Sequence, residues 1–213
     1  MNESTGGSLL GLNLSSEVPM VLLDLAKIDV SDIIDNKIVK EFPNLIFDHN
    51  KYIYDFNARL KKFSKFHILE TEDINRAIQL LGKPFTSKMI FNNGDFYPRN
   101  FIRMPDDRIV LIDWEMWNPG RNPFYLIDYI ENVAAVCFVH MWNNVLWQKK
   151  YVSELKKVLP VTIDDFQKAI LIKSLELADF WFKDDGTNIL CTNQVTIFKN
   201  ALNDEYIEKL WRI

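Results

Sequence analysis

Three polar residues stand in an order that suits phosphoryl transfer: Asp95, Asn100 five positions later, and Asp113 at the end of the next apolar run. In that chemistry a carboxylate accepts the proton of an attacking hydroxyl, and oxygen ligands hold the Mg²⁺ that bridges the nucleotide phosphates. Carboxylate and amide oxygens meet both needs. The spacing therefore predicts a catalytic loop followed by a strand that ends in a metal ligand.

The surrounding residues extend this pattern. They read N-G-D-F-Y-P-R-N over 93–100, V-L-I-D-W-E over 110–115 and N-P-F-Y-L-I-D over 122–128. This order resembles the aminoglycoside phosphotransferase and choline kinase family, which has H-G-D-x-x-x-x-N, then I-D-[FW]-[GE], then a segment like D-P-x-x-D-L-A. The resemblance implies a protein-kinase-like fold, ATP and Mg²⁺ as cofactors, and transfer of the γ-phosphoryl group to a small-molecule hydroxyl. The acceptor would be an aminoglycoside, choline, or another amino alcohol or sugar.

The resemblance also implies a role for each matching residue. Asp95 would be the catalytic base, and Asn100 and Asp113 would bind the metal and its nucleotide. Asp128 would lie buried in a helix and brace the catalytic loop through the backbone amides of that loop. Asn93 stands where the family has His, so a local hydrogen bond that supports the loop is expected of it.

The residues after Asp113 are candidates for substrate contact. Glu115 replaces the Gly of the protein-kinase D-F-G, as in choline- and thiamine-kinase-like members of the family, and Trp114 and Trp117 flank it. With Trp142 and Trp147 these tryptophans suggest an aromatic cage for a quaternary ammonium group. The alternative is packing in the core or at an interface, which the spacing of the last two favours.

Other polar residues have two interpretations as well. Acidic residues near the end of a long helical segment would either meet a cationic substrate or form a solvated surface: Asp179, Asp184 and Asp185. The three histidines fit no metal-binding spacing and are predicted to be structural or to lie on the surface: His49, His67 and His140.

The elements that position these residues follow from hydrophobic periodicity. Apolar residues at spacings of three and four predict helices over 18–28, 48–65, 71–81, 122–142, 149–158, 162–183, 193–202 and 204–211. Short apolar runs predict strands over 88–91, 101–104 and 108–112, with a Met-Pro-Asp-Asp turn between the last two. The predicted fold class is α+β, mostly helical, with a small β element that carries the polar residues.

The part of the chain before Asp95 departs from the family. The family places a β-rich lobe there, whose Lys grips the nucleotide phosphates. In this chain the residues before Asp95 read as helices, and the segment 18–28 resembles the family helix that follows that lobe. We therefore predict a kinase-like C-terminal lobe without the β-rich lobe, forming a single domain over 1–213, with 1–16 as a flexible N-terminal segment.

Composition and sequence pattern argue against nucleic acid and membrane as partners. The chain has 213 residues and a formal net charge of −4, which lacks the basic excess that a nucleic-acid partner requires. No apolar stretch reaches the length that spans a bilayer, and the N-terminus does not read as a secretory signal. Two isolated cysteines, Cys137 and Cys191, favour a reduced, cytoplasmic protein.

Two functions follow from the sequence. The first is an ATP-dependent phosphotransferase. The alternative is a catalytically silent binding or scaffold domain, whose exposed apolar face at the missing lobe would be covered by a partner chain or by self-association. Four leucines near the N-terminus are candidates for that face: Leu9, Leu10, Leu12 and Leu14.

Overall fold

The computed structural model describes residues 14–114, 125–141, 143–183 and 188–212. This part of the chain is mostly helical and carries two small antiparallel sheets, as the predicted α+β class requires. The first half contains α1 (Leu14–Leu25), α2 (Val30–Ile34), α3 (Lys37–Glu41), α4 (His49–Lys65), α5 (Thr71–Leu81), β1 (Met89–Phe91), β2 (Phe101–Arg103) and β3 (Ile109–Leu111). The second half contains β4 (Ile127–Tyr129), α6 (Ile130–His140), α7 (Val145–Val158), α8 (Ile163–Trp181), α9 (Ile189–Ala201) and α10 (Asp204–Trp211).

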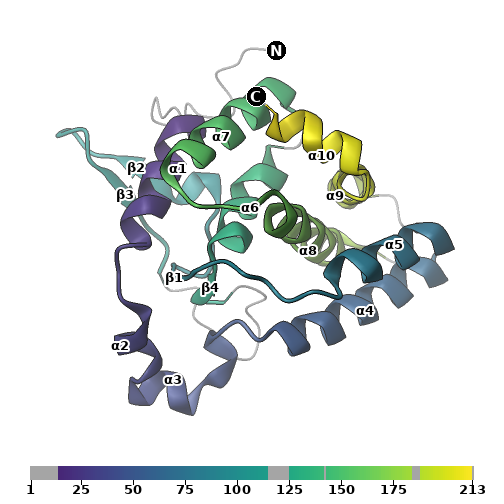
Figure 1. Cartoon of the computed structure of the whole chain (residues 1–213), viewed down its shortest axis with the longest axis horizontal. Coiled ribbons are helices and arrows are strands. Elements are labelled where there is room, and N and C mark those ends of the chain that lie inside the picture. Colours follow the sequence, from purple (N-terminus) through teal and green to yellow (C-terminus); the bar gives the residue numbers. More distant parts are fainter. Residues whose placement is uncertain (1–13, 115–124, 142, 184–187, 213) are drawn as a thin grey trace.

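The core lies around α6 and α8. Helix α6 is apolar on nearly all sides, and its residues from Ile130 to Val139 are buried. Helix α8 packs against α6, α9 and α4, while α1 packs against α7 (Figure 1). The helices thus form a bundle beside the two sheets. Among the described residues, no helix is long and apolar enough to cross a membrane.

The two sheets place the polar segments next to one another. Strand β2 pairs with β3, with Ile102 opposite Val110, and forms the hairpin that the Met-Pro-Asp-Asp turn predicts. All three predicted strands are present. Strand β1 pairs with β4, with Ile90 opposite Asp128. This last strand corrects the prediction of one helix over 122–142, because α6 begins only at Ile130 and 122–124 lie outside the described residues.

Local capping explains most of the predicted helix starts. The Asp48 side chain accepts hydrogen bonds from the amides of Asn50 and Lys51, and the Thr162 side chain accepts one from the Asp165 amide. Helix α5 begins at Thr71, and Glu70 is its N-cap.

The N-terminal side of the chain differs from the prediction in two ways. Helix α1 begins at Leu14, so the flexible segment predicted over 1–16 does not extend over 14–16, and the candidate leucines at 9, 10 and 12 lie outside the described residues. The short helices α2 and α3 were not predicted, because five residues each are too few to show helical periodicity.

Candidate functional site

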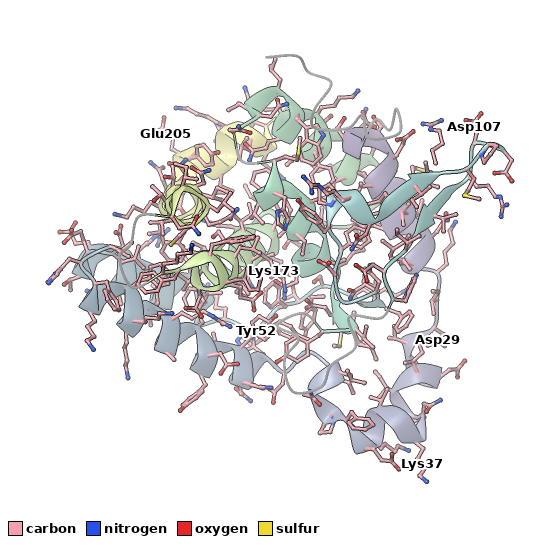
Figure 2. All side chains as sticks on the ribbon, turned by 180° about the vertical axis from the view of Figure 1, so that it is seen from behind. Asp29, Lys37, Tyr52, Asp107, Lys173 and Glu205 are labelled. Atoms are coloured by element: carbon pink, nitrogen blue, oxygen red, sulfur yellow. The ribbon has the colours of Figure 1, made fainter. Side chains whose placement is uncertain are left out.

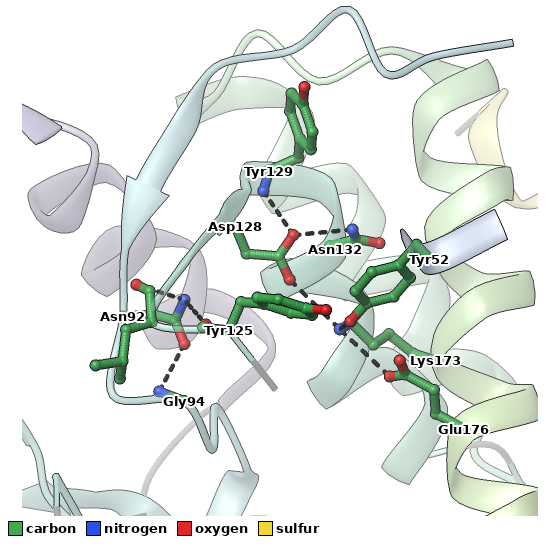
Figure 3. Close-up of polar contacts among 10 residues, drawn as sticks. Tyr52, Asn92, Gly94, Tyr125, Asp128, Tyr129, Asn132, Lys173 and Glu176 are labelled. Atoms are coloured by element: carbon green, nitrogen blue, oxygen red, sulfur yellow. Dashed lines mark hydrogen bonds and ion pairs between the residues drawn. The ribbon is translucent and has the colours of Figure 1, made fainter. Parts of the chain in front are cut away.

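A tight turn after β1 leads the chain into the predicted catalytic loop. Gly94 has φ 80, a left-handed conformation that favours glycine. The buried side chain of Asn92 holds this turn, since its Oδ1 accepts a hydrogen bond from the Gly94 amide at 2.8 Å. Its Nδ2 donates to the carbonyl oxygens of Tyr125 and Leu126 at 2.9 and 3.2 Å (Figure 3). The turn is therefore fixed to the segment that enters β4.

Asn93 joins the catalytic loop to the end of β3. Its side chain is fully buried, and its Oδ1 accepts a hydrogen bond from the Asp95 amide at 3.1 Å. Its Nδ2 lies within hydrogen-bond distance of the carbonyl oxygens of Asp95, Ile112 and Asp113, at 3.1, 2.8 and 3.3 Å. One amide thus brings Asp95 and Asp113 together, although they are distant in sequence.

Asp95 and Asn100 are in direct contact. The Asn100 Nδ2 donates to the Asp95 carbonyl oxygen at 2.8 Å and to the Asp95 Oδ2 at 3.1 Å. Burial raises the pKa of the Asp95 carboxyl and the nearby charge of Asp113 adds to this, while the bond from Asn100 opposes both. Among the described residues both contacts of the Asn100 amide use its nitrogen, so its Oδ1 stays available as an oxygen ligand.

Asp113 follows β3 in an unusual backbone conformation. Its φ of 62 lies in the left-handed region, which costs free energy for any residue with a side chain. The preceding Ile112 amide donates to the Asn100 carbonyl oxygen at 2.8 Å, so the strand end is fixed to the loop. Backbone strain of this kind is often found at functional sites, and Asp107 on the exposed hairpin turn has a similar φ of 65.

The side chains that would hold a metal are few but of a suitable kind. No group of three or more His, Cys, Asp or Glu side chains suited to a metal occurs in the described part of the chain. Mg²⁺ at phosphoryl-transfer sites needs only one or two protein carboxylates, since phosphate oxygens and waters complete its coordination. The half-buried Asp113 carboxylate and the Asn100 Oδ1 fit that requirement.

Two side chains of helix α6 contact the catalytic loop. The buried Cys137 thiol donates to the Phe96 carbonyl oxygen at 3.3 Å, and the His140 ring packs edge-on against the Tyr97 ring with centroids 4.2 Å apart. Burial lowers the pKa of His140 to about 4, so this imidazole is neutral at physiological pH. Both side chains have a structural role, as predicted for the histidine.

Asp128 is buried, but it does not form the brace that the family resemblance implies. It lies in strand β4 instead of a helix, and no catalytic-loop amide in the described residues donates to its carboxylate. Its Oδ1 accepts hydrogen bonds from the Tyr129 amide at 2.7 Å and the Asn132 Nδ2 at 2.9 Å (Figure 3). Its Oδ2 lies 3.4 Å from the Lys173 ammonium. Asn92 and Asn93 hold the loop instead.

The candidate substrate residues that the structure describes lie in different surroundings. Trp114 is 43% exposed, donates its ring N–H to the Leu111 carbonyl oxygen at 2.8 Å, and stacks on Phe91 beside Asp113. Trp147 stacks on the buried Tyr151, which supports packing instead of a cage. The other candidates of this group lie outside the described residues: Glu115, Trp117 and Trp142.

The acidic candidates show a similar split. Asp179 forms ion pairs with Arg59 and Lys62, at 3.4 and 2.6 Å, so its charge is already compensated. Asp184 and Asp185 lie outside the described residues.

Sequence reasoning missed three residues: Asn92, which holds the loop, and the buried pair Lys173 and Glu176. Asn92 precedes an Asn-Gly-Asp run, and an asparagine two positions before a left-handed glycine is the signal of a side-chain-held turn. Lys173 and Glu176 stand in an otherwise apolar helical stretch, which predicts a buried ion pair.

Comparison of the chain with models of protein families, with curated proteins and with solved structures finds no match. Function is therefore inferred from the residues and geometry above.

Proposed function

We propose that this protein is an ATP-dependent phosphotransferase that moves a γ-phosphoryl group to the hydroxyl of a small molecule. The observation that carries the proposal is the Asn93 amide, which joins the backbone of Asp95 to that of Ile112 and Asp113. A predicted base and a predicted metal ligand thus share one buried anchor. Asn100, the third member of the motif, hydrogen bonds to the Asp95 carboxylate.

Asp95 acts as the base in this proposal. The acceptor oxygen attacks the γ-phosphorus, its proton passes to the Asp95 carboxylate, and the bond from the γ-phosphorus to the bridging oxygen breaks to release ADP. Burial raises the pKa of Asp95, and a raised pKa makes a carboxylate a better proton acceptor. The hydrogen bond from Asn100 fixes the carboxylate in one orientation.

Asn100 and Asp113 hold Mg²⁺ with the nucleotide. When bound, this ion offsets the negative charge of the phosphates during transfer. The Asp113 side chain is half-buried next to the Asp95 carboxyl, and the two negative charges together would attract a cation. The left-handed backbone of Asp113 sets the direction of that side chain.

The outer face of the β2–β3 hairpin offers a surface for the nucleotide base. Phe101 and Leu111 are buried on the inner face, whereas Ile102 and Val110 lie opposite each other on the outer face and are partly exposed. Ile112, which precedes the proposed metal ligand, is 36% exposed. An apolar surface beside a metal ligand suits a flat base with attached phosphates.

The alternative is a kinase-like scaffold domain without activity. It is favoured by the absence of any strand among residues 14–88 of the described chain, where Ile46 forms only an isolated bridge with Ile127. In this case a partner chain would supply the lobe that grips the phosphates. A phosphotransferase should bind ATP with Mg²⁺ by itself, whereas the scaffold domain should not bind the nucleotide without its partner chain.

Calorimetric titration of the full-length chain with ATP, with and without Mg²⁺, tests the proposal. We expect Mg²⁺-dependent binding that is lost in Asp113→Ala and kept in Asp106→Asn, a control on the exposed hairpin turn. Asp95→Asn should keep the binding and lose about 10²- to 10⁴-fold in turnover with an acceptor. If the wild-type chain shows no Mg²⁺-dependent binding, or if Asp113→Ala leaves it unchanged, the proposal is wrong.

A further inference from the structure

We propose that Lys173, in the middle of α8, is a positioning residue for the loop that carries Asp95, and that it acts through Asp128. The contact between Lys173 and Asp128 supports this role. That the role serves catalysis rests on the proposed function. The contacts of Lys173 that carry this role are with Asp128, Glu176 and Tyr52. Its effect on the loop passes through strand β4.

Lys173 lies at the centre of a buried polar cluster. Its side chain is fully buried, in the interior of the molecule beside Tyr52 (Figure 2). The ammonium nitrogen lies 3.4 Å from the Asp128 Oδ2, 3.4 Å from the Glu176 Oε2 and 3.1 Å from the Tyr52 hydroxyl oxygen (Figure 3). The cluster thus joins α4, β4 and α8.

The charges of this cluster depend on the lysine. A buried carboxylate needs an opposite charge or several hydrogen bonds, because burial takes it out of water. Asp128 and Glu176 are both almost fully buried, and in the described part of the chain Lys173 is the cation that reaches both. Removing the ammonium would leave Asp128 buried without its counter-ion.

Asp128 fixes the strand that holds the loop. It lies opposite Ile90 in the β1–β4 pair, and its Oδ1 binds the Tyr129 amide and Asn132 where β4 passes into α6. Two positions beyond Ile90, the Asn92 amide donates to the Leu126 carbonyl oxygen at 2.8 Å.

The Asn92 side chain continues the path to the loop, since it binds the Tyr125 carbonyl oxygen and the Gly94 amide. Burial and the nearby Glu176 carboxylate raise the pKa of Tyr125, whose side chain extends from this junction toward Lys173 (Figure 3). A displaced β4 would therefore move Gly94, and with it Asp95.

Two-dimensional ¹H–¹⁵N NMR spectra of the full-length chain test this role without any ligand. The amide signals of Gly94 and Asp95 report the position of the loop. In Lys173→Met we expect both signals to shift. The matched control is Lys168→Met, which removes another buried lysine of α8, one paired with Asp165 at 2.5 Å. It should lower the melting temperature and leave both loop signals at their wild-type positions.

Two double variants identify the carboxylate through which Lys173 acts. Lys173→Met with Asp128→Asn should fold and return the loop signals to their wild-type positions, because no charged Asp128 then remains. Lys173→Met with Glu176→Gln removes the same number of charges but keeps Asp128, so the signals should stay displaced. These two variants decide the question even if Lys173→Met alone does not fold.

Three results would each overturn the role of Lys173. The first is that Lys173→Met keeps the wild-type loop signals. The second is that the double variant with Asp128→Asn does not fold or keeps displaced loop signals, and the third is that both double variants return the loop signals to their wild-type positions. If turnover is found, Lys173→Met should lose about 10- to 100-fold in kcat with little change in the KM for ATP. Because the spectra need no nucleotide, a chain that binds no ATP would refute the proposed function and leave the positioning role to be judged by the loop signals.

Discussion

Glu131 makes the stability of this protein depend on pH in a direction opposite to that of most carboxylates. The residue lies in the first turn of α6 and is fully buried. Its Oε1 accepts a hydrogen bond from the Thr162 amide at 3.4 Å, and the nearby Ser87 hydroxyl partly offsets the effect of burial on its pKa. Burial raises the pKa of Glu131 from 4.5 to about 7, so the folded chain binds a proton that the unfolded chain has already released.

The sign and size of the effect follow from linkage. Below the unfolded pKa of 4.5, Glu131 is protonated in both states and its contribution to stability is fully present. As the pH rises through the folded pKa of about 7, that contribution is lost. Raising a carboxyl pKa by this amount corresponds to about 3 kcal/mol of unfolding free energy between about pH 4 and about pH 8.

Urea unfolding of the wild-type chain and of Glu131→Gln at both pH values measures this loss. The glutamine side chain has nearly the same shape and does not titrate, so any constant cost of the substitution cancels between the two conditions. We expect the stability of Glu131→Gln relative to wild type to rise by about 3 kcal/mol from about pH 4 to about pH 8. A relative stability that stays constant over this range would show that Glu131 keeps an ordinary pKa and that the reasoning is wrong.

Four further substitutions test two backbone positions of the site and the starts of helices α8 and α5. Asp113→Gly should raise the unfolding free energy by about 1 kcal/mol, because glycine adopts the φ of 62 without strain, and calorimetry should show loss of Mg²⁺-dependent ATP binding in the same variant. Gly94→Ala should lower the unfolding free energy by about 1 to 2 kcal/mol, because alanine is strained at the φ of 80 that Gly94 adopts. Urea unfolding measures this change, and an unchanged unfolding free energy would contradict the turn described. Thr162→Ala removes the cap on the Asp165 amide and should cost about 1 kcal/mol in thermal unfolding, whereas Thr71→Ala, one position inside α5, should cost less.

The sequence predicts elements whose signals are local. The hairpin of β2 and β3 follows from two apolar runs joined by a Met-Pro-Asp-Asp turn, and helices α4 and α8 follow from hydrophobic periodicity. Strand β4 could not be predicted in this way. Its residues continue an apolar helical pattern, and only the pairing with β1, far away in the chain, makes them a strand.

In the candidate site, too, the contacts between residues close in sequence were predictable and those between distant residues were not. The order of Asp95, Asn100 and Asp113 predicts a loop and a strand end that meet, and the structure brings them together through Asn93. The partner of Asp128 was not predictable from that order. Lys173 lies far along the chain, and only the packing of α8 against β4 and α4 brings its ammonium to the carboxylate.

Neutral amides, not charges, hold the loop of the candidate site. Asn92 and Asn93 each donate and accept hydrogen bonds inside the protein, and this allows them to satisfy backbone groups of both kinds without burying a charge. An aspartate at either position would face carbonyl oxygens with a second acceptor. The amides bind backbone groups of Asp95 and Asp113, and the Asp95 carboxylate accepts a hydrogen bond from Asn100. The loop can therefore be held in place without an ion pair to either carboxylate.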